Sequence, residues 1–136
     1  MSEEPENRER QGSEPFLSAE KLMKLVEDPS VAGIVNRIIS AAMKMQASGI
    51  VLLPGEKNLA VRFVIDGVPE DVMAPPVHIH RMVLARLKYI AGLDPLEKRG
   101  GIEGAILLRF CGVPCTLELS TEEGEWGEAM TIRIVR

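Results

Sequence analysis

Aromatic side chains are scarce in this sequence of 136 residues: they make up 4% of it, with one Trp, one Tyr and three Phe. Aliphatic residues and seven methionines must therefore fill the core, and 46% hydrophobic residues suffice for one domain. No apolar run approaches the roughly 20 residues that cross a bilayer, so we expect no direct membrane insertion. Two cysteines without a signal-peptide pattern indicate reduced thiols and a cytoplasmic protein.

Positive charge is also in short supply, because 16 Lys and Arg stand against 20 Asp and Glu, for a net charge of −4. A nucleic-acid binder needs a basic patch to neutralise phosphates, so this balance argues against a nucleic-acid partner. Residues 1–15 hold five Glu, two Arg and no aliphatic side chain after Met1. Such a segment buries too little apolar surface to offset its ordering entropy. We expect a disordered acidic tail over 1–15 and a single folded domain over 16–136.

The spacing of hydrophobic residues predicts two helices, three strands, a third helix and three more strands. Apolar residues recur with helical spacing from Val31 to Met43, after which Ser48-Gly49 is expected to close the helix, and the period changes to two over 59–65. Asp66-Gly67 predicts a type I′ hairpin turn, and Gly92 a helix stop. The other elements are expected at 18–28, 50–53, 68–73, 77–91, 102–110, 113–120 and 129–135, with an acidic loop at 122–128. The order ααβββαβββ predicts an α+β fold, with a mainly antiparallel sheet of five to six strands and helices on one face.

Motifs for nucleotide, metal and hydrolytic chemistry are missing from these residues. A Walker A loop needs a Gly-Lys pair, and the sequence has none. His78 and His80 stand two residues apart at a predicted helix start, where they project about 200° apart and cannot share a metal ion. Cys111 and Cys115 flank a predicted turn, so they are either inert thiols or able to form a bridge. We therefore expect no catalytic residue, metal or cofactor.

Four residues are candidates for protein contact. Trp126 lies among glutamates, and it either folds back onto the sheet edge or serves as an exposed anchor. Glu122 belongs to the same acidic loop. Arg62 is expected on the outer face of a strand, and Arg99 in the connector that follows the third helix.

Several stretches occur together in the order of one known family. They are LAVRFVIDGV over 59–68, AGLD after the third helix, the Ser120-Thr121 pair and the Gly127-Glu128 pair. Residues 29–136 thereby resemble the domain that precedes the motor in type II secretion and type IV pilus assembly ATPases, the GspE/PilB-like proteins. The resemblance implies a fold like the PAS-like N-terminal domain of those ATPases. It also implies a structural role for Asp66, Gly67, Gly92, Gly104, Ser120, Thr121, Gly127 and Glu128.

The departures from the family pattern concern charged positions. Gly49, Val51 and Leu53 stand where the family carries Asp, His and Glu, and Ala105 and Glu118 stand where it carries two arginines. In the family these arginines reach nucleotide phosphates held by the motor domain, and the motor would begin where this sequence ends.

The resemblance therefore implies a non-catalytic interaction module that docks on or regulates a full-length secretion or pilus ATPase, or binds another copy of itself. The alternative is a small-ligand sensor of the nucleotide-binding type.

Overall fold

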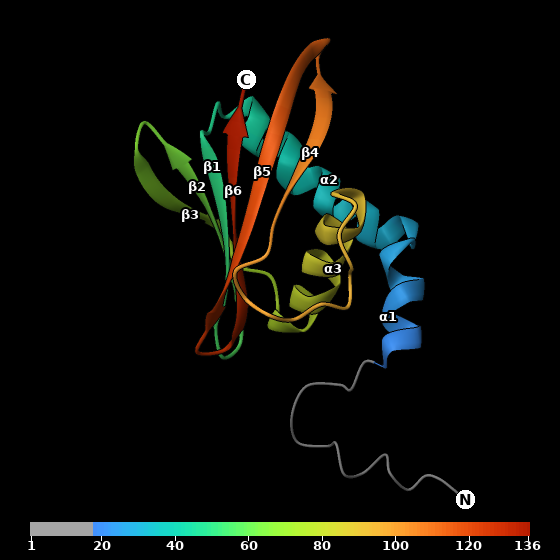
Figure 1. Ribbon diagram of the computed structural model, residues 1–136. Coiled ribbons are helices and arrows are strands. Elements are labelled where there is room, and N and C mark those ends of the chain that lie inside the picture. Colours follow the sequence, from blue (N-terminus) through green and yellow to red (C-terminus); the bar gives the residue numbers. More distant parts are fainter. Residues whose placement is uncertain (1–17) are drawn as a thin grey trace, which may run out of the picture.

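Three α-helices lie on one side of a six-stranded antiparallel sheet in the computed structural model, which describes residues 18–136 (Figure 1). The α+β class, the strand number and the element order ααβββαβββ are as the sequence predicts. The expected acidic tail over 1–15 and the expected start of the folded domain at residue 16 lie outside the described residues. Among residues 18–136, no helix has both the length and the apolar character that a bilayer crossing requires.

Each of the first two helices begins directly after a side chain that caps its N-terminus. Helix α1 (Ala19–Val26) follows Ser18, whose Oγ accepts a hydrogen bond from the Lys21 amide, and α2 (Pro29–Lys44) follows Asp28. The expected end of α2 at Ser48-Gly49 is wrong. The helix ends at Lys44, because Gln46 adopts a positive φ of 57° and turns the chain toward the sheet.

The third helix is shorter than expected, because its first turn is a separate 3-10 helix, η2 (Val77–Ile79), that precedes α3 (His80–Ile90). Gly92 follows α3 with a φ of 78°, a conformation that glycine adopts without a Cβ clash. Leu22 and Val26 of α1 pack against Ala85 of α3 in a small second cluster beside the main core.

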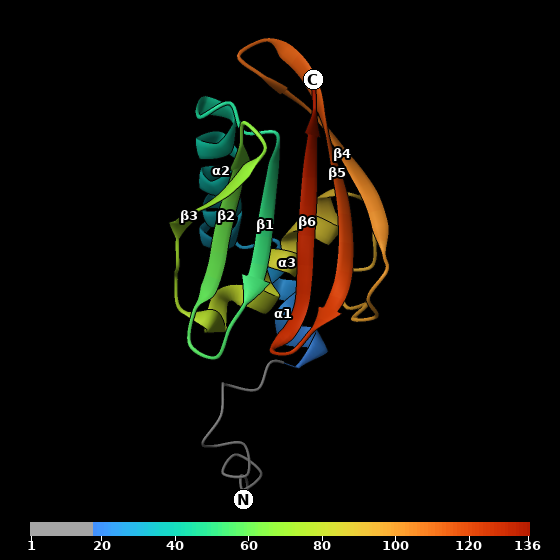
Figure 2. The same ribbon diagram turned by 90° about the vertical axis from the view of Figure 1, so that its left-hand side faces the viewer.

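The sheet has the strand order β3-β2-β1-β6-β5-β4, so β3 and β4 are its two edge strands (Figure 2). The strands are β1 (Gly49–Pro54), β2 (Leu59–Ile65), β3 (Val68–Met73), β4 (Glu103–Phe110), β5 (Val113–Gly124) and β6 (Gly127–Val135). The expected acidic loop over 122–128 is wrong in extent. Strands β5 and β6 stay paired to Gly124 and Gly127, which leaves a two-residue turn.

Side chains along each strand point alternately to the face that the helices cover and to the open face. Leu52 of β1, Phe63 of β2 and Met130 of β6 are fully buried beneath the helices. Their neighbours Val51 and Arg62 lie opposite each other on the open face, and no helix covers that face among residues 18–136 (Figure 1). The sheet therefore presents one broad surface that the described part of the chain leaves uncovered.

Two of the glycines that the family resemblance singles out occupy positions where a side chain is disfavoured. Asp66 and Gly67 have φ values of 53° and 80°, as the two central positions of a type I′ turn require. A Cβ on Gly104 of β4 would lie 2.7 Å from a methyl carbon of Leu93 in the connector after α3. Gly104 thus permits close packing of the connector on the helix-covered face of β4.

Candidate interaction surface

The turn between β5 and β6 projects from one end of the sheet and consists of Glu125 and Trp126. Trp126 keeps 50% of its surface exposed. It borders two concave surfaces, a cleft on the helix side and a groove next to β1 and β2. We call this turn, with the flanking Gly124 and Gly127, the Trp126 hairpin tip.

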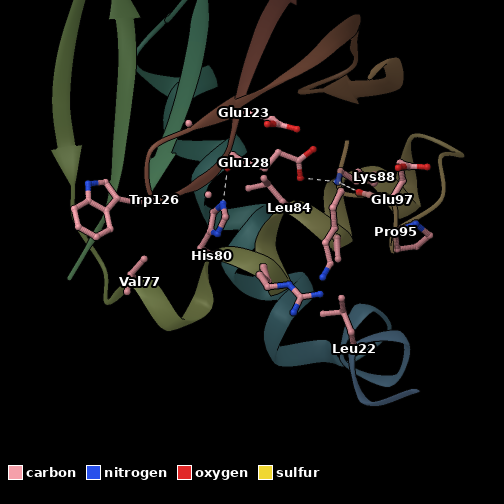
Figure 3. Close-up of a pocket in the computed structure, with 15 residues that line it drawn as sticks. Leu22, Val77, His80, Leu84, Lys88, Pro95, Glu97, Glu123, Trp126 and Glu128 are labelled. Carbon is pink, nitrogen blue, oxygen red and sulfur yellow. Dashed lines mark hydrogen bonds and ion pairs between the residues drawn. The ribbon is translucent and has the colours of Figure 1, made fainter. Parts of the chain in front are cut away.

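The cleft on the helix side encloses about 430 Å³ between the Trp126 hairpin tip, α3 and the connector after α3. Figure 3 shows its lining, with Trp126 and Val77 at one end and Leu22 and Pro95 at the other. Charges of both signs line it, including Arg81, Lys98 and Glu123. The cleft has no single-sign field that would by itself select an anion such as a phosphate.

A buried ion pair forms one wall of the cleft. Lys88 Nζ lies 2.7 Å from Glu128 Oε1, and the two side chains are only 3% and 12% exposed (Figure 3). The ammonium also donates to the backbone carbonyl of Glu97. Lys88 therefore ties α3 to both the hairpin and the connector. The second carboxylate oxygen, Glu128 Oε2, is buried without a hydrogen-bond partner among residues 18–136.

A second contact from α3 holds the same part of the hairpin. His80 Nε2 donates to the backbone carbonyl of Glu128 at 2.6 Å. A Cβ on Gly127 would lie 3.2 Å from His80 Cε1, so the glycine lets the strand rest on the imidazole ring. His80 is buried and His78 is exposed. Within the described residues 18–136, no three or more His, Cys, Asp or Glu side chains converge as metal ligands would.

The groove on the other side of Trp126 encloses about 340 Å³. Its walls include Leu53, Ala60, Arg62 and Trp126, so two of the sequence candidates meet at one surface. Arg62 Nε lies 2.7 Å from Asp71 Oδ1 on β3, which holds the guanidinium in place along the groove. Tryptophan and arginine, which both line this groove, are residue types enriched at protein interfaces.

The structure places the other two candidates away from this groove. Arg99 is 80% exposed on the connector, and its guanidinium lies 3.0 Å from Glu97 Oε2. The hydrogen bonds from Arg99 hold the pKa of Glu97 below its ordinary value. Glu122 is exposed on β5, opposite Ala129 of β6. Arg99 and Glu122 therefore do not join Arg62 and Trp126 in one site.

Three of the five positions that depart from the family pattern lie in one row across the sheet. Ala105 of β4 pairs with Glu118 of β5, which pairs with Arg133 of β6, which pairs with Gly49 of β1. Arg133 Nη2 lies 2.9 Å from Glu118 Oε1. The carboxylate that stands in place of a family arginine is thus engaged by an arginine of the adjacent strand.

The cysteines and the Ser-Thr pair lie apart from the cleft and the groove. Cys111 is exposed in the two-residue turn between β4 and β5, Cys115 is buried on β5, and both are free thiols. Thr121 Oγ1 accepts a hydrogen bond from the Ile102 amide, which ties β5 to the residues that enter β4. Ser120 lies next to Thr121 on the exposed side of β5.

Sequence reasoning missed the two residues of α3 that hold the hairpin. His80, Leu84 and Lys88 follow each other at intervals of four, which puts a histidine and a lysine on the buried stripe of the helix. A lysine on an apolar stripe signals a buried partner, since an unpaired charge is costly there. The sequence alone could not identify Glu128 among the neighbouring glutamates as that partner.

Comparison with known proteins places these features in a family. Residues 24–136 match the family model described as type II/IV secretion system protein. The chain is 33% identical over 123 residues to the type II secretion system ATPase E of Vibrio cholerae, covering 90% of this chain and 24% of that protein. It is 34% identical over 116 residues to the type II secretion system protein E of Pseudomonas aeruginosa (85% and 23%). It is 39% identical over 93 residues to the type IV pilus assembly ATPase PilB of Myxococcus xanthus (68% and 16%).

These relatives are much longer than this sequence of 136 residues. The chain spans about a quarter or less of each. The match nevertheless covers every strand of the sheet, both longer helices and the Trp126 hairpin tip. The chain belongs to the type II/IV secretion system protein family.

Proposed function

We propose that this domain is a non-catalytic docking module in the cytoplasm that binds a full-length secretion or pilus ATPase through the Trp126 hairpin tip and the adjoining groove. The observation that carries the proposal is the placement of Trp126. The only Trp of the chain is half-exposed at the tip of a hairpin, and it shares a groove with Arg62. Tryptophan and arginine are the side chains most enriched among interface hot spots.

The rigidity of the hairpin supports this role. Lys88 and His80 anchor the strand just beyond Trp126, so the indole is presented from a fixed position. A pre-organised anchor loses less conformational entropy on binding than one on a flexible loop.

The charge pattern supports a role without catalysis. The printed residues contain no Gly-Lys pair, and therefore no Walker A loop. Ala105 and Glu118 replace the two arginines that the family resemblance assigns to phosphate contact, and Glu118 is engaged by Arg133. A carboxylate would repel a phosphate rather than attract it.

The test is capture of a purified full-length secretion or pilus ATPase from the same organism by the immobilised chain. Trp126→Ala should weaken binding by roughly 30-fold, because a buried aromatic anchor contributes on the order of 2 kcal/mol or more. Arg62→Ala should weaken it as well, and Glu122→Lys should mainly change the salt dependence.

Val113→Ala is the matched control. Val113 is also an exposed apolar residue beside a hairpin turn, but it lies at the opposite end of β5. Equal capture by the folded Trp126→Ala variant and the parent chain would exclude the hairpin tip as the docking surface.

The cleft supports one alternative function, the binding of a small ligand. Its volume falls in the range of ligand pockets, and Glu128 Oε2 is an acceptor without a partner among residues 18–136. A thermal-shift screen with adenine and guanine nucleotides tests it, because a ligand that binds the native state raises the melting temperature. Such a shift, lost in the Glu128→Gln variant, would favour the sensor over the docking module.

A further inference from the structure

The two edge strands of the sheet differ in how they are protected. Strand β3 carries Pro69 followed by Glu70 and Asp71, and its pairing with β2 shifts register near Arg62. Proline, charge and irregular register are the common devices that keep an edge strand from pairing with another chain. Strand β4 has eight residues, no proline, and charges only at Glu103 and Arg109.

The centre of β4 is apolar and exposed. Leu107 has 80% of its surface exposed, the largest fraction among the exposed large hydrophobic residues of 18–136. Figure 2 shows β4 at the outer edge of the sheet, and β5 is the one strand of residues 18–136 that pairs with it. A long unprotected edge of this kind is a template for a further strand.

The register fixes which backbone groups of β4 point outward. Phe110 and Val113 flank the two-residue turn and are therefore a hydrogen-bonded pair, as in other hairpins of this type. Hydrogen-bonded and non-bonded pairs alternate along an antiparallel ladder. The even-numbered residues of β4 therefore bond to β5. The N–H and C=O groups of Glu103, Ala105, Leu107 and Arg109 point to the free edge.

We propose that β4 pairs with β4 of a second copy of this chain as antiparallel strands around a two-fold axis at Ile106. In this register Glu103 lies opposite Arg109 of the second copy, and Ala105 opposite its Leu107. All four pairs join residues with outward-pointing backbone groups, so the full ladder can form. The side chains of Glu103 and Arg109 are both exposed, and they meet twice in each dimer.

Charge complementarity selects this register over its neighbours. A shift of two residues in one direction places Glu103 opposite Leu107, and a shift in the other places it opposite Cys111. Both shifted registers lose the two carboxylate–guanidinium contacts. Opposite charges directly across a strand pair are stabilising, whereas like charges are destabilising.

The pairing joins two sheets into one and leaves the Trp126 hairpin tip of each copy free. It is thus independent of the docking role proposed above. One strand pair buries a small area, so we expect a transient dimer with a dissociation constant on the order of 10–100 µM.

Sedimentation velocity of the 136-residue chain over a concentration series tests the proposal. We expect a concentration-dependent monomer–dimer equilibrium. In the Glu103→Arg variant, the new arginine of each copy would face Arg109 of the other copy. Two pairs of like charges would then oppose each other, which should weaken the dimer by about tenfold or more. The Arg109→Glu variant should do the same, and the double variant Glu103→Arg/Arg109→Glu should restore the dimer.

Glu70→Arg on the opposite edge strand is the matched control and should leave the equilibrium unchanged. Amide hydrogen exchange of the parent chain gives a second readout that needs no variant. The outward amides of Ala105 and Leu107 should gain protection as concentration rises, while the inward amides of Ile106 and Leu108 should change little. A chain that stays monomeric throughout, a dimer insensitive to Glu103→Arg, or one equally weakened by Glu70→Arg would overturn the proposal.

Discussion

Lys88 Nζ lies 2.7 Å from Oε1 of Glu128, a residue 40 positions further along the chain, and the contact joins α3 to the start of β6. Both side chains are almost fully withdrawn from solvent. Replacing Lys88 by methionine preserves most of its apolar stem but leaves the carboxylate buried without its cation. We expect a loss of about 3–5 kcal/mol in the free energy of unfolding, measured by urea denaturation.

An exposed ion pair of the same sheet provides the control. Arg133→Met removes the partner of Glu118, whose side chain is half-exposed, and should cost less than about 1 kcal/mol. The double variant Lys88→Met/Glu128→Gln should recover part of the loss, because the uncompensated charge is gone. Equal effects of Lys88→Met and Arg133→Met would show that the buried pair contributes little.

The turn between β2 and β3 depends on backbone conformation rather than on packing. A Cβ on Gly67 meets no atom within 4 Å, yet its φ is 80°. Gly67→Val should destabilise the domain by about 1–3 kcal/mol, because a β-branched residue is strained at positive φ. Thermal and urea unfolding measure the loss.

The Gly67→Asn variant tests whether the loss of stability comes from backbone strain at positive φ. Asparagine tolerates the left-handed region better than valine, so Gly67→Asn should lose clearly less stability. If both variants unfold like the parent chain, the turn does not fix the pairing of β2 with β3.

The elements that the sequence predicts well are those whose periodicity reflects burial on one face. The spacing from Val31 to Met43 predicts α2, because these residues fall on the buried face of the helix. The sequence predicts a loop for the acidic stretch after Ser120, because alternation between polar and apolar residues is weak there. Strand β5 continues to Gly124 because its backbone stays paired with β6, a long-range effect that composition does not report.

The candidate surface was predictable only in part. Residue type alone singled out Trp126 and Arg62, but their shared groove depends on the pairing of β1 with both β2 and β6. Arg99 and Glu122 have the same residue chemistry and lie elsewhere. Which charged residues meet depends on the pairing of strands that are far apart in the sequence.

The only Tyr of the chain reports on the contact between α1 and α3. Tyr89 donates its phenolic proton to Glu27 Oε2 at 2.9 Å, and this hydrogen bond together with the carboxylate charge raises the pKa of Tyr89 above its ordinary value. Because the pKa is raised in the folded state, the contact stabilises the fold at neutral pH. That stabilisation is lost as the pH rises through the raised pKa.

Absorbance of tyrosinate follows this single group as the pH is raised. Glu27→Gln should shift the titration midpoint downward, while Glu20→Gln in the first turn of α1 should leave it in place. An unchanged midpoint in Glu27→Gln would mean that the phenol does not bond to this carboxylate in solution.

The two cysteines should differ sharply in reactivity. Cys111 is exposed in the turn before β5, whereas Cys115 is buried in the core beneath the helices. A thiol reagent can reach a buried cysteine only when the fold opens, so its reaction is limited by unfolding. In the native protein we expect one equivalent of thiol to react quickly with a disulfide reagent, and the second only after denaturant is added. Cys111→Ser should remove the fast phase, and Cys115→Ser should leave it unchanged. Two fast equivalents in the native parent chain would show that β5 does not hold Cys115 in the core.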